Sequence, residues 1–408
     1  MKNPIPAQAG LDVYQWFREA AERGNAYAQF NLGLMCKRGE GVPRDEAQAF
    51  HWMHLAADQG LAFAQNHLGC MYYHGRGVAA SDKVAAYWFH RAARQGEASA
   101  QQNLGQMYKQ GRGVVRCERS AVTWLGRAAE QGLASAQNLM GEAHLQGLGG
   151  GGRNYSLALA WFRRAAVQND VAAQLNLGLM YKYGRGVARN DARALAWLRQ
   201  AAARDDAVAQ RLVGVAYAEG LGTPADPLRA YAWLLRAAEL DDADAQFNLG
   251  VMLASGKRLA RDDAQAAGWF RRAAEAGHAS AQFNLGGMYA RGRGVQRDDE
   301  LALSWYLQAA EQGAPNAQFN VAVMYAHGHG VVKDEELAVA WYRCAAEQGD
   351  ASAQNNLGAM YAHGMGVQQD QAKAADWYQR AAEQGHALAK SNLGRLMGKA
   401  PPSTGRVA

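Results

Sequence analysis

The tryptophans of this chain recur at a fixed interval. All eleven are spaced 36 residues apart in the 408-residue sequence, except for one interval of 37. They are Trp16, Trp52, Trp88, Trp124, Trp161, Trp197, Trp233, Trp269, Trp305, Trp341 and Trp377. A constant period between about 20 and 50 residues indicates stacked copies of one supersecondary unit, each of which buries its apolar face against its neighbours. The period therefore predicts a repeat array in place of several unrelated globular domains.

Each period contains two stretches with helical spacing of apolar residues. In the copy that starts at Ala279, the pattern predicts a first helix, the A helix, over 279–291 and a second, the B helix, over 298–312. Small residues accompany each tryptophan and let the helices approach closely. The chain opens with a lone B helix near 11–23 and closes with a lone A helix near 387–398.

The fold class follows from this pattern. We expect an all-α, right-handed α-solenoid of about ten 36-residue helix-turn-helix repeats with a half repeat at each end. A single solenoid is expected over 11–398, between a flexible N-terminus at 1–10 and a flexible C-terminal tail at 399–408.

A glycine-rich turn joins the A helix to the B helix. Gly292 and Gly294 form a Gly-x-Gly that recurs in nine of the ten connections, and glycine ends helices because it adopts a left-handed conformation without steric cost. Nine of the ten turns also place an N-cap residue six positions after the first glycine, with Cys117 as the exception. These residues are Asp45, Ser81, Asn154, Asn190, Asp226, Asp262, Asp298, Asp334 and Asp370. No turn differs from the others or carries a P-loop sequence, so we interpret the glycines as structural and expect no bound phosphate.

Composition narrows the classes of function. The formal net charge of +6 is small for this length, and Asp and Glu are interspersed throughout, so a nucleic-acid partner is not favoured. The four cysteines form no CxxC pair, which indicates neither a disulfide framework nor a zinc site. The sequence shows no apolar run of transmembrane length and no secretion signal, so we expect a cytoplasmic protein without membrane contact.

The motif that recurs with variations at this period is AQFNLGxMY, then GxGV, an N-cap and AxxWxxxAAEQG. This pattern closely resembles the Sel-one-like repeat (SLR) family, a relative of the tetratricopeptide repeats. The resemblance covers 11–398. It implies a non-enzymatic adaptor or scaffold that binds a peptide or protein partner. A cysteine-rich branch of the family is associated with binding or hydrolysing β-lactams, but this chain lacks paired cysteines in its repeats. An RNA-binding helical repeat is a further alternative, although the near-constant asparagine column described next does not favour a base-reading code.

In the related tetratricopeptide fold, the A helices line a concave groove, and the resemblance implies a ligand surface at the same place. The candidate residues are asparagines that precede the Leu-Gly glycine by two positions, the phenylalanines before them, and polar residues at the helix ends. They are Phe247, Asn248, Phe283, Asn284, Arg291, Phe319, Asn320, His327, Asn356 and His363. An amide both donates and accepts hydrogen bonds, which suits a peptide backbone or terminal carboxylate. In the alternative interpretation, the asparagines satisfy neighbouring helices and the phenylalanines belong to the core.

Catalytic and cofactor motifs are not indicated. His327 and His363 occupy equivalent positions one repeat apart, but no nearby Cys or acidic pair completes a metal set. We expect no catalytic residue, cofactor or metal site. The one irregular period contains four consecutive glycines, Gly149 to Gly152, which are costly to order. The sequence therefore predicts a soft point, and a hinge as a hypothesis, at 147–154.

Overall fold

The computed structural model describes residues 7–256 and 260–398, and every regular element in these ranges is helical. The chain divides into two compact units, unit 1 up to Arg204 and unit 2 from Asp205 onward. The helices of unit 1 are α1 (Ala7–Glu22), α2 (Ala26–Arg38), α3 (Glu46–Asp58), α4 (Ala62–His74), α5 (Asp82–Arg94), α6 (Ala98–Gln110), α7 (Glu118–Glu130), α8 (Ala134–Gln146), the short 3-10 helix η1 (Leu148–Gly150), α9 (Tyr155–Val167), α10 (Val171–Tyr183) and α11 (Asp191–Ala202).

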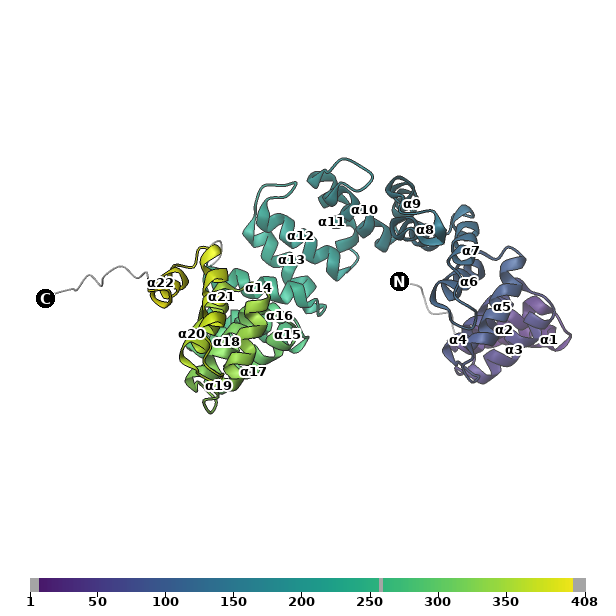
Figure 1. Ribbon diagram of the computed structural model, residues 1–408. Coiled ribbons are helices and arrows are strands. Elements are labelled where there is room, and N and C mark those ends of the chain that lie inside the picture. The colour runs from purple at the N-terminus through teal and green to yellow at the C-terminus, as the bar shows by residue number, and fades with distance from the viewer. Residues whose placement is uncertain (1–6, 257–259, 399–408) are drawn as a thin grey trace. The chain divides into compact units, whose positions relative to one another are not determined.

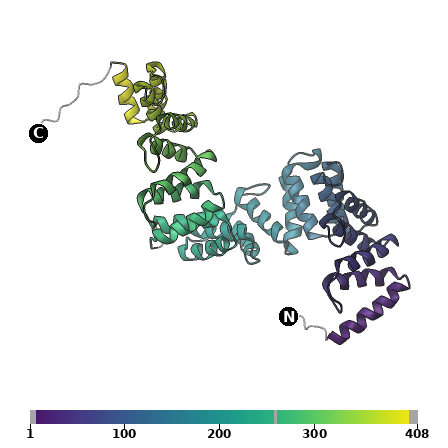
Figure 2. The ribbon, with the colours of Figure 1, turned by 90° about the horizontal axis from the view of Figure 1, so that it is seen from below.

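Unit 2 continues the same alternation of A and B helices. Its helices are α12 (Ala207–Glu219), α13 (Pro227–Glu239), α14 (Ala243–Ser255), α15 (Asp263–Glu275), α16 (Ala279–Arg291), α17 (Asp299–Glu311), α18 (Pro315–His327), α19 (Glu335–Glu347), α20 (Ala351–His363), α21 (Gln371–Glu383) and α22 (Ala387–Leu396). Within each unit, every helix packs on the next one along the chain (Figures 1 and 2). This confirms the predicted α-solenoid of 36-residue repeats. A single continuous solenoid over 11–398 stays a prediction.

The ends of the helices follow the predicted signals. Asp298 precedes α17 in an extended conformation, and its carboxylate accepts a 2.9 Å hydrogen bond from the Leu301 amide. Gly292 ends α16 in the left-handed region at φ 63°. Cys117, the predicted exception, precedes α7 without a side-chain capping bond. At the termini, α1 begins at Ala7, while residues 1–6 and the tail 399–408 lie outside the described residues.

The second glycine of the turn makes a contact between repeats. Gly294 lies so close to the first turn of α15, in the preceding repeat, that a Cβ on it would be 2.0 Å from the carbonyl oxygen of Asp263. Gly77, Gly113, Gly330 and Gly366 approach the preceding B helix in the same way. The turn at 292–295 therefore ends a helix and makes a stacking contact between repeats. This supports the interpretation of its glycines as structural.

A different glycine, inside the A helix, makes room for a large side chain. Gly286 faces Tyr306, the residue after Trp305 on the following B helix, and an added Cβ would be 2.9 Å from the ring. The corresponding distance is 2.6 Å between Gly250 and Phe270. Around these contacts lies a core of alanine and leucine that is almost wholly buried, and it continues from repeat to repeat. Close packing of A on B thus depends on a small residue at this position, which is glycine in the other A helices and Ala322 in α18.

The recurring glutamine of each A helix joins two successive B helices. Gln282 is 3% exposed, and its Nε2 donates a 3.1 Å hydrogen bond to the Ala274 carbonyl at the end of α15. Its Oε1 accepts a 2.7 Å bond from Nε2 of Gln312, the C-cap of α17. We call this pair of bonds the glutamine clasp. It satisfies both ends of a buried amide, which would otherwise be costly.

The clasp is incomplete in the middle of the chain. Two other repeats have a different residue at the position equivalent to Gln312, namely Arg204 and Ala276. The corresponding buried oxygens, Oε1 of Gln174 and Oε1 of Gln246, have no hydrogen-bond partner among the described residues. Both glutamines still donate from Nε2 to the preceding B helix, at 3.3 Å to the Ala166 carbonyl and 3.1 Å to the Ala238 carbonyl. The Nε2 of Gln174 also donates a 3.4 Å hydrogen bond to Oε1 of Gln200.

The irregular loop packs against the preceding repeat. Its extra residue is accommodated by η1, which packs against α7, so that a Cβ on Gly149 would be 3.3 Å from Val122. Gly149, Gly150 and Gly152 have positive φ, whereas Gly151 has φ −85°. The loop therefore has a defined conformation that needs glycine at several positions, and its softness stays a prediction.

Candidate functional site

The three candidate phenylalanines are half-buried where the A and B helices of one repeat meet. Phe283 lies 5.7 Å from the ring of Tyr306, and Phe319 lies 5.8 Å from that of Tyr342, measured between ring centroids. Phe247 contacts Phe270 in the same way and also stacks on His278 at 4.6 Å. These rings are thus partly committed to packing, as the alternative interpretation holds, and each leaves part of its surface accessible.

Two of the candidate asparagines pair with tyrosines of the preceding B helix. The Nδ2 of Asn356 donates a 3.2 Å hydrogen bond to the hydroxyl of Tyr342, and Asn320 bonds the Tyr306 hydroxyl in the same register. Burial of Tyr342 raises its pKa, so the hydroxyl stays protonated and can donate a further hydrogen bond.

Asn284 and Asn248 have no such tyrosine on the preceding B helix. The equivalent position carries Phe270 for Asn284 and Leu234 for Asn248. Neither side chain carries a hydroxyl, so this pairing cannot form there. The asparagine column is therefore uniform in sequence but not in its hydrogen bonds.

The polar residues at the helix ends fold onto their own helices to different extents. Arg291 is exposed, and its Nη1 donates a long 3.4 Å hydrogen bond to the Gly287 carbonyl. His327 Nδ1 lies 2.9 Å from the Val323 carbonyl, and its ring stacks on His329 at 5.7 Å. Because a carbonyl only accepts, Nδ1 carries the proton, which leaves Nε2 of the neutral ring as an acceptor. His363 ends α20 and is exposed.

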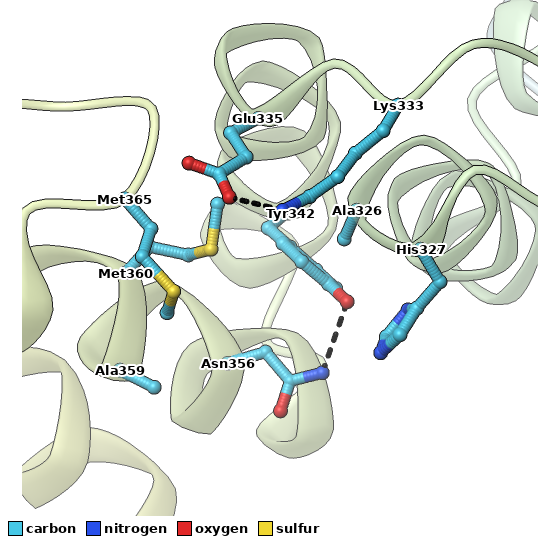
Figure 3. Close-up of a pocket in the computed structure, with 9 residues that line it drawn as sticks. All are labelled: Ala326, His327, Lys333, Glu335, Tyr342, Asn356, Ala359, Met360 and Met365. Carbon is cyan, nitrogen blue, oxygen red and sulfur yellow. Dashed lines mark hydrogen bonds and ion pairs between the residues drawn. The ribbon is translucent and has the colours of Figure 1, made fainter.

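The structure brings two of the candidate residues together in one cavity. A cavity of about 370 Å³ opens between α18, the turn after it, α19 and α20. Both His327 and Asn356 line it (Figure 3). The other lining residues are Ala326, Lys333, Glu335, Tyr342, Ala359, Met360 and Met365. The remaining candidates do not line this cavity.

Polar and apolar groups occupy different parts of the cavity. The paired Tyr342 and Asn356 extend toward His327, whereas the thioethers of Met360 and Met365 form a separate apolar wall (Figure 3). Lys333 and Glu335 form a 2.6 Å ion pair at the rim. Such a site can enclose an apolar side chain and hydrogen-bond a polar group beside it.

The sequence analysis missed most of the residues that line this cavity. Ala359 lines this cavity at an A-helix position where other repeats have Leu179, Val251 or Val323. A narrower cavity of about 210 Å³ lies at the equivalent place in unit 1, beside Asn103 and Phe89.

The described residues offer no clear metal or membrane site. Within 7–256 and 260–398, no group of three or more His, Cys, Asp or Glu side chains is arranged to hold a metal ion. In the same ranges, every helix is too short or too polar to cross a bilayer.

The fold defines a helical repeat protein, and a family model identifies the repeat. The model of the Sel1 repeat matches the chain at eleven segments, which together span nearly all of residues 14–386. The segments are 14–25, 26–61, 62–97, 98–133, 134–170, 171–206, 207–242, 243–278, 279–313, 315–350 and 351–386. The chain belongs to the Sel1 repeat family, as the resemblance implied. Proteins of this family are generally scaffolds for protein interaction.

Two solved structures resemble the whole array. One is a protective antigen of uropathogenic Escherichia coli that displays an SLR fold; it is 34% identical, with a TM-score of 0.66, over 95% of this chain and 91% of that one. The other is a Sel1 repeat protein from Oxalobacter formigenes, also 34% identical, with a TM-score of 0.60, over 78% of this chain and 93% of that one. No curated protein matches the sequence.

Proposed function

We propose that this chain is a non-catalytic adaptor that binds a peptide or protein segment on the A-helix surface of unit 2, anchored in the cavity between α18 and α20. The observation that carries the proposal is the cavity itself, in which His327 and Asn356 meet an apolar wall. Family membership supports a scaffold role in general.

The chemistry of the cavity favours one kind of anchor. Its volume of about 370 Å³ accommodates an apolar side chain of a peptide, and burial of such a side chain contributes about 1.5–3 kcal/mol. The thioethers of Met360 and Met365 adapt to differently shaped side chains. Beside them, the Tyr342 hydroxyl can donate to a peptide carbonyl and Nε2 of His327 can accept from a peptide amide.

The residues around the cavity extend the proposed surface. Phe319 and Phe283 lie on the two preceding A helices with part of each ring accessible, and Asn284 lacks the tyrosine partner that Asn320 and Asn356 have. An extended segment that follows the A helices would meet an aromatic surface and an available amide after the anchor.

A matched pair of substitutions tests the proposal. Peptides are selected from a random library against the full chain, and their dissociation constants are then measured on variants. Ala359→Leu fills the cavity and is expected to weaken binding about tenfold or more, which corresponds to loss of the anchor. Val251→Leu makes a similar change at the equivalent, exposed position of α14, and should leave binding within about twofold. Selected peptides that bind Ala359→Leu as tightly as the parent chain would refute the proposed site.

A further inference from the structure

The two units carry opposite charge. Unit 1 contains 24 Lys and Arg against 14 Asp and Glu, whereas unit 2 contains 19 against 23. The formal charges are therefore +10 and −4, which the modest total of +6 conceals. The excess is concentrated between Arg76 and Arg204, where 18 basic residues accompany only 7 acidic ones. A local excess of this size produces a positive potential that attracts an anionic partner.

The acidic residues of this stretch are mostly engaged within the repeats. Asp82, Glu118 and Asp191 form ion pairs with Arg112, Arg116 and Arg189. Glu97 and Asp170 cap α6 and α10, and Glu142 accepts a hydrogen bond from Asn138. Few carboxylates are left to neutralise the arginines of the B helices.

Three of these arginines stand at the same position of successive B helices. Arg91, Arg127 and Arg164 each lie over the tryptophan three residues earlier, with the guanidinium carbon 5.2, 4.5 and 4.8 Å from the ring centroid. None of the three forms an ion pair with a described residue of the chain. Stacking on the ring restricts each side chain and leaves its charge available. We call these residues the arginine row.

The helices that carry the row are neighbours. Gln131, the C-cap of α7, donates a 2.9 Å hydrogen bond to the Gly96 carbonyl directly after α5. The His90 ring of α5 lies 6.1 Å from Trp124 of α7, and Trp161 of α9 packs against the core that contains Leu125. Packed helices lie about 8–10 Å apart, so we expect a similar spacing between consecutive arginines of the row.

This spacing suits an acidic α-helix. Seven residues of an α-helix span about 10.5 Å, so carboxylates at every seventh residue can meet consecutive arginines of the row. Single-stranded nucleic acid fits less well because its binding relies on open aromatic faces for base stacking. Here the guanidinium groups already cover the rings of Trp88, Trp124 and Trp161.

Unit 2 repeats the stacking but not the charge. Arg236, Arg272 and Arg380 also lie over tryptophans, at 4.9, 4.9 and 4.5 Å. Each is followed three residues later by a glutamate, at Glu239, Glu275 and Glu383. In unit 1 only α7 shares this pattern, with Glu130, whereas α5 has Arg94 and α9 has Val167 at that position. Arg272 also pairs with Asp241 at 3.1 Å. The stacking is thus a common feature of the repeats, and the net positive charge belongs to unit 1.

We infer that the arginine row on α5, α7 and α9 is a docking surface for an acidic α-helical segment of a partner protein. The surface lies on the B helices and is distinct from the proposed peptide site of unit 2, so either can fail without the other. Binding there should depend steeply on ionic strength, because several charge pairs form together at an exposed surface.

The test uses three probes of equal charge with the full chain. The first is a helical peptide of about four heptads with glutamate at every seventh residue; the second has the same composition with the glutamates at every fifth residue; the third is a single-stranded oligonucleotide. The first peptide should bind at least about tenfold more tightly than the second, and more tightly than the oligonucleotide. Equal binding of the two peptides, or tighter binding of the oligonucleotide, would overturn the inference.

Variants locate the interaction. Replacement of Arg91, Arg127 and Arg164 by glutamine should weaken binding of the first peptide about tenfold or more, whereas the same replacement of Arg236, Arg272 and Arg380 should change it less than about threefold. Both variants lose three charges and three stacked pairs, so helix content and thermal unfolding of each serve as the control for folding. An equal loss of binding in the two variants would contradict a specific surface.

Discussion

The Nε2 atom of Gln312 donates a 2.7 Å hydrogen bond to the buried Oε1 of Gln282, and this bond completes the clasp between successive B helices. Gln312→Ala leaves the Oε1 of Gln282 without its partner, so we expect a loss of about 1–3 kcal/mol in the free energy of unfolding. Ala276→Gln supplies the missing donor for Gln246 and should stabilise its repeat by about 0.5–1.5 kcal/mol. Urea denaturation of the two variants measures both effects, and the same sign for both would contradict the clasp.

Two glycines of neighbouring helices should respond oppositely to alanine. Gly250→Ala places a Cβ 2.6 Å from the Phe270 ring, and the resulting overpacking should destabilise the protein by about 1–3 kcal/mol. Gly268 lies inside α15, and no other atom lies within 4 Å of the place that a Cβ on it would occupy, so Gly268→Ala should stabilise by about 0.5–1 kcal/mol through helix propensity. Thermal unfolding compares the variants, and stabilisation by Gly250→Ala would show that this packing contact is not tight.

The Asp263 carboxylate should make stability depend on acid pH. Its hydrogen bonds with Arg261 and with Arg293 of the next turn lower its pKa from 3.8 to about 2. Because the pKa is lower in the folded state, this stabilisation is fully present above about pH 4 and is lost as the pH falls to about 2. Asp263→Asn should reduce stability at neutral pH and flatten the profile in that window. An unchanged difference between the two proteins from pH 5 to pH 2 would exclude this role.

The missing cap of α7 offers a gain in stability. Cys117 makes no side-chain capping bond at the start of α7, and the Ser120 hydroxyl lies 3.2 Å from its sulfur. Cys117→Asp restores the residue type found in most other repeats and should stabilise the protein by about 1 kcal/mol. Asp298→Ala removes a working cap and should cost a similar amount. Denaturation midpoints that move in the same direction for both would contradict the capping account.

The glycine loop should exchange its amide hydrogens faster than the equivalent loops. Three of its four consecutive glycines have positive φ, and ordering such a segment has a high entropic cost. We therefore expect weak protection of the amide hydrogens of residues 145–155. Gly151 has a negative φ and no atom within 4 Å of an added Cβ, so Gly151→Ala should stabilise by about 0.4–1 kcal/mol and slow the exchange. Protection equal to that of the loop at 292–298 would remove the predicted soft point.

The helices and their ends could be predicted closely from the sequence because local signals determine them. The A helix expected at 279–291 is α16, and the expected N-cap Asp298 directly precedes α17. These features depend on backbone hydrogen bonds and glycine conformations within a few residues, and tenfold repetition reinforces each signal.

The candidate site could be predicted only in part because it depends on contacts between repeats. The sequence indicated His327 and Asn356 but not Tyr342, which binds Asn356 across 14 residues of sequence. Nor did the pattern reveal the cavity beside Ala359, whose lining residues come from α18, α19, α20 and the turns after α18 and α20. The charges of the two units were not predicted either, because +10 and −4 partly cancel in the net charge of +6 for the whole chain.

The contact between Gly294 and Asp263 also bears on how such a chain can change its length. Six of the turns fit against the B helix of the repeat before them with no room for even a Cβ, at Gly77, Gly113, Gly186, Gly294, Gly330 and Gly366. Recombination that adds or deletes a whole 36-residue period brings an equivalent glycine against an equivalent carbonyl, so the array can grow or shrink in steps of one repeat. A shift of one residue instead places a side chain in that contact, and the one 37-residue period of this chain has four consecutive glycines there, Gly149 to Gly152.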